Sequence, residues 1–201
     1  MIQRAFVMTE TERHPLQPFL PANARLLMLG SFPPPRKRWC MDFFDPNRSN
    51  MMWNVFGEIF FGDADRLVDA TNRTFRRDDI ERLLSERGIA IFDTAMSVRR
   101  LNDNASDKFL EVVEKTDIPT LLTRIPLCRD IVCTGQKSFS VLTEDYGVPV
   151  PAMGEYSVFR LVDREMRLWR MPSTSRAFPM PLQDKAAYYR RMMVQIGILD
   201  R

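Results

Sequence analysis

The chain has 201 residues, of which 45% are hydrophobic and 27% are charged, and its formal net charge at pH 7 is +3. This composition is typical of a globular protein with one buried core and excludes a disordered or fibrous chain. No apolar run approaches the ~18 residues of a membrane helix. The first 15 residues contain no apolar segment followed by small residues. We therefore expect a cytoplasmic protein without a signal peptide or a membrane segment.

Residues that build metal centres and nucleophilic triads are few. The three cysteines, Cys40, Cys128 and Cys133, form no CxxC pair, so they predict neither a zinc site nor an iron–sulfur cluster. The one histidine, His14, lies in a proline-rich segment before the first predicted strand. We do not place it among the catalytic residues, given how several groups must converge in such sites. The sequence predicts no metal and no cofactor.

Residues 1–24 contain three prolines and are interpreted as an extended lead-in over the core. Beyond them, short apolar runs predict strands, and apolar residues at helical spacing predict helices. The predicted strands are about 25–30, 89–92, 130–133, 156–162 and 167–171, with a tight turn at Asp163-Arg164. The predicted helices are 50–60, a helix from a capping box at Asp78 and Glu81 to Gly88, 108–113, 119–125, one from about Lys137 to Leu142, and 182–196.

Strands that alternate with helices predict an α/β protein. We expect one three-layer α/β/α domain over residues 1–201, with a central, mostly parallel, four-stranded sheet.

Four polar segments begin where predicted strands end. They are Gly30-Ser31-Phe32-Pro33, Asp93-Thr94, Thr134-Gly135-Gln136-Lys137 and Pro172-Ser173-Thr174-Ser175-Arg176. In a parallel sheet these segments would meet at one edge, where α/β sheets place their ligands. Hydroxyls, backbone N–H groups near glycine, and Lys or Arg heads are the groups that hold a phosphate backbone. By charge alone, the basic residues, with 36–38 and 99–100 among them, fit an ordinary solvated surface equally well.

The loop that leads to Asn50 is too long, aromatic and polar for a plain connector, so we expect an active site there. Flat faces on which a base could stack are supplied by Phe32, Trp39, Phe43 and Phe44. Polar groups able to orient a water are supplied by Asp42, Asp45, Asn47 and Asn50. Structural roles stay open beside these: Asn50 as a helix cap, Phe43 and Phe44 as core residues, and Asp93 as the brace of a turn.

Four features together resemble the uracil-DNA glycosylase superfamily. They are HPLQPFLPANARLLMLGSFPP from His14, the N-x-x-W pattern of Asn50 and Trp53, GIAIFDTA from Gly88, and the pair TGQK and PSTSRA. They span about His14 to Phe178, in the expected order and on the expected elements. Within the superfamily the chain looks most like the deoxyinosine (hypoxanthine)-DNA glycosylase branch and related bacterial members.

This resemblance implies a monofunctional enzyme that flips a deaminated base out of DNA and hydrolyses its N-glycosidic bond, as in base excision repair. Asn50, with Asp42 and Asp45 as further candidates, would direct a water at C1′ of the sugar. The base would be contacted by Phe32, Phe43, Phe44 and Asp93. The DNA would be held by Gly30, Ser31, Gly135, Gln136, Lys137, Ser173, Thr174, Ser175 and Arg176. We expect DNA as the partner of a monomer.

The chain departs from the uracil-specific members in its motifs. Phe32 stands where they place Asp or Asn, Asp93 replaces the Asn that reads uracil, and the STSRA loop lacks their histidine. Asp45-Pro46 stands in place of the His-Pro of the deoxyinosine branch, with extra residues before the N-x-x-W pattern. These differences favour a purine such as hypoxanthine over uracil.

Two other functions stay open from the sequence. One is a DNA-binding protein that recognises a flipped base without cleaving it, which Phe32 and the missing histidine favour and the polar 42–50 loop opposes. The other is an enzyme that acts on free nucleosides or nucleotides, which the scattered basic residues oppose.

Overall fold

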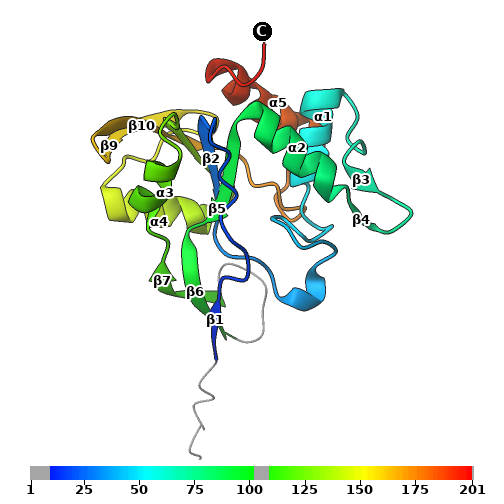
Figure 1. Ribbon diagram of the computed structural model, residues 1–201, viewed down its shortest axis with the longest axis horizontal. Coiled ribbons are helices and arrows are strands. Elements are labelled where there is room, and N and C mark those ends of the chain that lie inside the picture. The colour runs from blue at the N-terminus through cyan, green and yellow to red at the C-terminus, as the bar shows by residue number, and fades with distance from the viewer. Residues whose placement is uncertain (1–9, 102–108, 201) are drawn as a thin grey trace, which may run out of the picture.

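A sheet with the strand order β5-β2-β8-β10-β9 forms the centre of the computed structural model, which describes residues 10–101 and 109–200 (Figure 1). Four of its strands are parallel: β2 (Leu26–Gly30), β5 (Ile89–Asp93), β8 (Asp130–Cys133) and β10 (Arg164–Arg170). The fifth, β9 (Tyr156–Leu161), pairs antiparallel with β10 at the edge of the sheet. The predicted mostly parallel sheet is confirmed, with five strands in the described residues instead of four.

The fifth strand joins the sheet through a tight turn. Val162 and Asp163 both have positive φ angles, of 53° and 56°. Two such residues between antiparallel strands fit the right-handed twist of a hairpin. The turn predicted at Asp163-Arg164 thus begins one residue earlier, and β9 returns beside β10.

Helices cover both faces of the sheet, as Figure 1 shows. One layer holds α1 (Met52–Phe61), α2 (Arg77–Arg87) and α5 (Leu182–Gln195), and the other holds α3 (Ile118–Arg124) and α4 (Gln136–Tyr146). Because both faces are covered, the strands are apolar throughout, and the four residues of β2 before Gly30 are at most 1% exposed. Among the described helices, none combines the length and apolar character needed to cross a membrane.

The start of α2 differs from the prediction. Its N-cap is Arg76, which makes no side-chain capping bond, so the predicted capping box from Asp78 is wrong. Asp78 instead lies in the first turn, where a carboxylate is stabilised by the helix dipole. The predicted end is confirmed: Gly88 adopts φ 67°, and a Cβ atom there would lie 2.7 Å from the carbonyl oxygen of Asn23.

A second, three-stranded antiparallel sheet stands beyond the end of β5. It consists of β1 (Thr11–Arg13), β6 (Ala95–Arg100) and β7 (Leu110–Lys115). The predicted helix 108–113 is therefore wrong over its described residues. Its sequence, LEVVEK, is short and β-branched, and pairing with β6 decides its conformation. A shorter hairpin, β3 (Val68–Asp69) and β4 (Thr74–Phe75), lies in a mostly polar region to which the sequence assigned no element.

The described part of the lead-in runs along the edge of the central sheet. After β1 pairs with β6, the backbone groups of Phe19 and Ile91 exchange two hydrogen bonds, of 3.1 and 2.9 Å. The lead-in therefore pairs with the edge of β5, which would otherwise expose unpaired backbone groups. It also brings His14 beside the end of β5.

Asp130 joins the middle strands of the sheet through its side chain. One carboxylate oxygen accepts the indole N–H of Trp169 and the other accepts from the guanidinium of Arg167, both at 2.7 Å. The Asp130 side chain is only 4% exposed, whereas that of Arg167 is 29% exposed. The carboxylate thus satisfies two donors from β10.

We predict that Asp130→Ala lowers the free energy of unfolding by about 2–4 kcal/mol, because it leaves a buried indole N–H and a half-buried guanidinium without their acceptor. Urea denaturation measures this loss. Asp79→Ala is the matched control, since Asp79 makes an ion pair with the exposed side chain of Arg82 and should change stability by less than ~1 kcal/mol. Equal small losses in both variants would contradict the prediction.

Candidate active site

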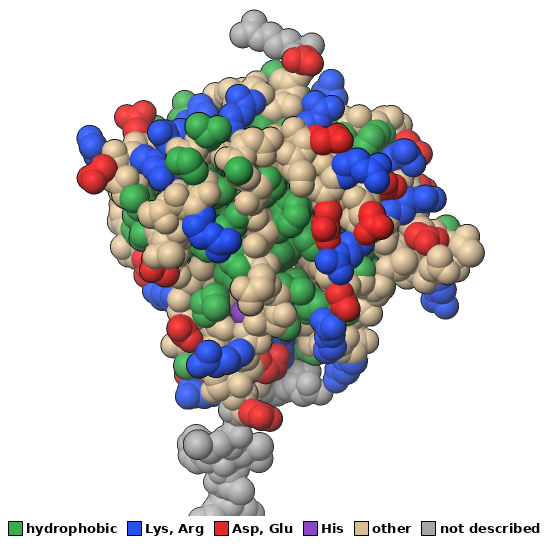
Figure 2. Space-filling model, in the orientation of Figure 1, with side chains coloured by type: hydrophobic (Ala, Val, Ile, Leu, Met, Phe, Trp, Pro, Cys, Tyr) green, Lys and Arg blue, Asp and Glu red, His purple; other side chains and the backbone are tan. Residues whose placement is uncertain are grey.

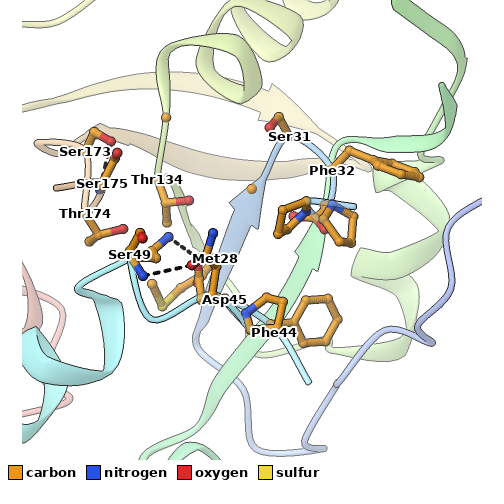
Figure 3. Close-up of a pocket in the computed structure, with 18 of the residues that line it drawn as sticks. Met28, Ser31, Phe32, Phe44, Asp45, Ser49, Thr134, Ser173, Thr174 and Ser175 are labelled. Atoms are coloured by element: carbon orange, nitrogen blue, oxygen red, sulfur yellow. Dashed lines mark hydrogen bonds between the residues drawn. The ribbon is translucent and has the colours of Figure 1, made fainter. Parts of the chain in front are cut away.

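A pocket of about 510 Å³ opens where the parallel strands end (Figure 3). Its size is that of a small-ligand site. Its walls come from the ends of β2, β5 and β8 and from the loops before α1 and α5. Of the predicted site residues, those that line it are Gly30, Ser31, Phe32, Phe44, Asp45, Asn50, Asp93, Gly135, Ser173, Thr174 and Ser175. The structure therefore brings together residues from all four polar segments and from the long loop.

Five predicted site residues do not line this pocket. Asp42 has a 64% exposed side chain that pairs with Arg36 at 2.7 Å. Phe43 is 5% exposed and packs against Phe19 and Trp53, which is the core role left open by the sequence. The other three are Gln136 and Lys137, which begin α4, and Arg176, which follows the last lining serine.

Asn50 is engaged at both ends of its amide. Its Oδ1 accepts the backbone N–H of Met52, the first residue of α1, at 2.9 Å. Its Nδ2 donates to Oδ1 of Asp45. The side chain therefore holds the start of α1 from the position before the N-cap residue, Met51, and at the same time orients Asp45. The helix-start role and the site role are combined in one residue.

Asp45 is the most perturbed carboxyl group of the pocket. Its pKa is raised to about 7: burial is the main cause, the negative charge of Asp93 adds to the shift, and the hydrogen bond from Asn50 opposes it. The residue adopts φ 47°, a left-handed conformation that Asp tolerates better than most side chains. An aspartate that changes charge near neutral pH can take or give a proton in a reaction.

The loop that carries Asn50 is joined to the last pocket loop. Asn50 and Ser175 form an antiparallel bridge, flanked by hydrogen bonds from Met51 N–H to Thr174 C=O and from Arg176 N–H to Ser49 C=O. These two loops form one wall, with the side chains of Ser173 to Ser175 on the side of the pocket opposite Phe32 and Phe44 (Figure 3).

Lys185 of α5 supports this wall from behind. It is fully buried, and its ammonium group donates to the carbonyl oxygen of Ser175 at 2.7 Å. Burial lowers the pKa of this lysine. The lysine therefore fixes the serine loop through the backbone. The hydroxyl oxygens of Ser173 and Ser175 accept the backbone N–H groups of Ser175 and Ala177, both at 3.2 Å, and their hydroxyl protons can still be donated to a ligand.

Asp93 ends β5 directly opposite Gly30 in the β2–β5 register. A Cβ atom at Gly30 would lie 2.2 Å from Oδ1 of Asp93, so only glycine leaves room for this carboxylate. The other oxygen, Oδ2, lies 2.9 Å from Nε2 of His14. His14 is not among the site residues predicted from the sequence, and the contact joins residues 79 positions apart.

The pocket aromatics are held by neighbours on other elements. The indole N–H of Trp53 donates to the backbone oxygen of Phe44 at 3.1 Å, which explains the tryptophan of the N-x-x-W pattern. Arg100 of β6 lies over the Phe32 ring at 5.5 Å and pairs with Glu12 of β1 at 2.9 Å. Arg100 is 7% exposed, so it supports Phe32 and is not part of a basic surface.

The basic residues do not all face one way. Arg38, of the short 3-10 helix η1 (Arg36–Arg38), lines the pocket. Arg99 pairs with Glu111 on the second sheet. On the face drawn in Figure 2, basic and acidic side chains of the described residues are intermixed. Within the described part of the chain, no three His, Cys, Asp or Glu side chains gather as a metal site would require.

The fold is similar to the solution NMR structure of a protein from Methanosarcina acetivorans described as a "putative Uracil DNA glycosylase". The TM-score is 0.60 at 20% sequence identity, and the match covers 91% of this chain and 99% of that chain. No protein-family model and no curated protein matches the chain. At this identity the likeness shows the fold, and the predicted α/β class with a uracil-DNA glycosylase-like architecture is confirmed.

We predict that the Asp45 carboxyl titrates near neutral pH in a carbon-detected NMR titration. Asn50→Ala should raise this pKa, because it removes a hydrogen bond that favours the charged form. Asp93→Asn should lower it, because it removes a neighbouring negative charge. An Asp45 pKa near the ordinary value of ~4 in all three proteins would contradict this description.

Proposed function

We propose that the protein is a monofunctional DNA glycosylase that hydrolyses the N-glycosidic bond of a deaminated base flipped out of DNA. The observation that carries the proposal is Asp45: an enclosed carboxyl group with a pKa of about 7, oriented by Asn50, in a pocket that also presents Phe44 and Asp93. Such a group can activate water, and the other two can contact a base. The uracil-DNA glycosylase-like fold supports the same reaction.

The proposed reaction divides the work between Asp45 and Asn50. The Asp45 carboxylate takes a proton from a water, whose oxygen forms a bond to C1′ of the sugar. The C1′–N bond breaks, and its electron pair leaves with the base, which takes up a proton from solvent, while Asp45 returns its proton to solvent. The products are an abasic sugar with a hydroxyl at C1′ and the free base. Asn50 acts by orienting Asp45, because its amide already serves the start of α1.

The serine loop is the proposed contact to the DNA backbone. Ser173, Thr174 and Ser175 line the pocket on the side opposite the aromatic residues (Figure 3). Hydroxyls and backbone N–H groups there can donate to phosphate oxygens, and Arg38 adds a positive charge at the pocket. Binding should therefore weaken as salt is raised.

The base is proposed to be hypoxanthine or uracil. Asp93 stands where uracil-specific members carry the Asn that reads uracil, and Phe32 where they carry Asp or Asn. These replacements support the purine, and with it the deoxyinosine branch. Both bases carry a ring N–H next to a carbonyl group, and a carboxylate can accept a hydrogen bond from that N–H.

Single-turnover cleavage of oligonucleotides containing hypoxanthine, uracil or xanthine, single-stranded and paired, tests the proposal. The wild type should convert one of them to abasic product, and Asp45→Asn should slow this step by about 10²- to 10⁴-fold, as expected for loss of a general base. Asn50→Ala should slow it less, because Asp45 remains. Asp42→Asn is the matched control: it changes an exposed aspartate of the same loop and should keep the wild-type rate.

Full activity in Asp45→Asn would show that another group activates the water. Product from none of the oligonucleotides would overturn the proposed hydrolysis. If salt-sensitive binding remained in that case, the protein would be a reader of flipped bases that does not cleave them.

A further inference from the structure

We propose that His14 is a positioning residue: it fixes Asp93 as a hydrogen-bond acceptor, and thereby restricts the pocket to bases that carry a ring lactam N–H. This inference rests on the proposed function, in which the pocket receives a flipped base. It assigns to the lead-in a part in substrate selection.

The position of His14 is determined by contacts on every side. Its side chain is fully buried, and its backbone N–H donates to the carbonyl oxygen of Met96 at 2.8 Å. Its ring packs against Phe92 and Phe32, with ring centroids 4.6 and 5.3 Å apart, and against Phe44 at 6.3 Å. All three of these phenylalanines also line the pocket. The imidazole therefore has little freedom to turn away from Asp93.

Both ring nitrogens of His14 have a partner. Nδ1 lies 3.0 Å from the carbonyl oxygen and 3.2 Å from the backbone nitrogen of Leu16, so it can either donate or accept there. Among the described residues, the hydrogen-bond partner of Nε2 is the Asp93 carboxylate, at 2.9 Å. A nitrogen that faces a carboxylate oxygen makes a favourable hydrogen bond when it carries the proton. The arrangement thus directs Nε2–H at Oδ2 of Asp93.

With Oδ2 taken by His14, the second oxygen of Asp93 remains for the pocket. Oδ1 lies over Gly30, where the missing side chain leaves it room, and Asp93 itself lines the cavity. A carboxylate held by an N–H donor in this way offers only lone pairs to a ligand.

An acceptor at this place distinguishes deaminated from normal bases. Hypoxanthine and uracil carry an N–H at the ring position that adenine and cytosine fill with a bare nitrogen lone pair. The first two can donate to Oδ1 of Asp93, whereas the ring nitrogen of adenine or cytosine would face it lone pair to lone pair. An unmade hydrogen bond of a charged group in an enclosed site is costly, so it discriminates strongly.

Binding and cleavage by His14 variants test the inference. His14→Phe fills the aromatic surroundings but removes the donor, and His14→Gln keeps an N–H that can reach the carboxylate. Each protein is measured with single-stranded oligonucleotides that differ only in one base, as the pairs hypoxanthine and adenine, and uracil and cytosine. Fluorescence anisotropy gives the affinities, single-turnover assays give the rates, and thermal unfolding reports on the fold.

The wild type should prefer the deaminated member of at least one pair by about 10- to 100-fold in affinity. His14→Phe should bring this ratio close to one while affinity for an abasic oligonucleotide stays unchanged, and His14→Gln should keep most of the ratio. Asp93→Asn should also lower it, because an amide can donate as well as accept. The Asp93→Asn variant tests the inference even if His14→Phe does not fold.

The inference would be overturned if folded His14→Phe kept the wild-type ratio of the affinities for the deaminated and the normal base. It would also be overturned if His14→Phe lost affinity equally for both members of a pair, because a merely structural histidine would behave in this way. Failure of the proposed function is distinguishable. If the wild type discriminates in binding but releases no base, hydrolysis is refuted. The role of His14 is then decided by the affinity ratios of the variants alone. Absence of any preference in the wild type refutes selection by Asp93.

Discussion

Burial of one carboxyl group beside a second is the constraint on which the pocket depends. Burial is the main cause of the raised pKa of Asp45, and the negative charge of Asp93 adds to it. Each group has its own compensation: Asn50 donates to Asp45, and His14 faces Asp93. Different partners allow the two carboxyls different roles, which is how one pocket can hold both a proton acceptor and a base-reading acceptor.

The surrounding fold holds these partners in place. Asn50 sits where a loop meets α1 and bridges to Ser175, and buried Lys185 fixes that bridge from behind. His14 is placed by the second sheet and by the pairing of the lead-in with β5. The central sheet supplies the floor, and the elements added around it orient the polar groups. A substitution in any of these surrounding elements should therefore change the orientation of the polar groups in the pocket, even where no lining residue is replaced.

The sequence predicted the central sheet well, because buried parallel strands are short apolar runs that end at recognisable residues such as Gly30. It failed where pairing partners decide conformation. Leu110–Lys115 is a strand because β6 lies beside it, and β6 itself was not predicted. Local pattern carries no information about such a partner.

The same limit applies to the site. Asp42 and Asp45, or Phe43 and Phe44, are alike in the sequence, yet the path of the loop sends one of each pair to the pocket and the other to the surface or the core. His14 could not be found from spacing, because its partner lies 79 positions away. The segment that begins HPLQPF is part of the resemblance to the superfamily. The structure shows that its histidine contacts the carboxylate of Asp93.

A crystal structure of the Asp45→Asn variant with an oligonucleotide containing hypoxanthine would show whether the pocket receives a flipped base. We expect the base outside the stack and inside the pocket, in contact with Phe44, with its ring N–H on Asp93 and its C1′ facing residue 45. A base that stays stacked in the DNA, or a strand bound away from the ends of β2 and β5, would contradict this expectation.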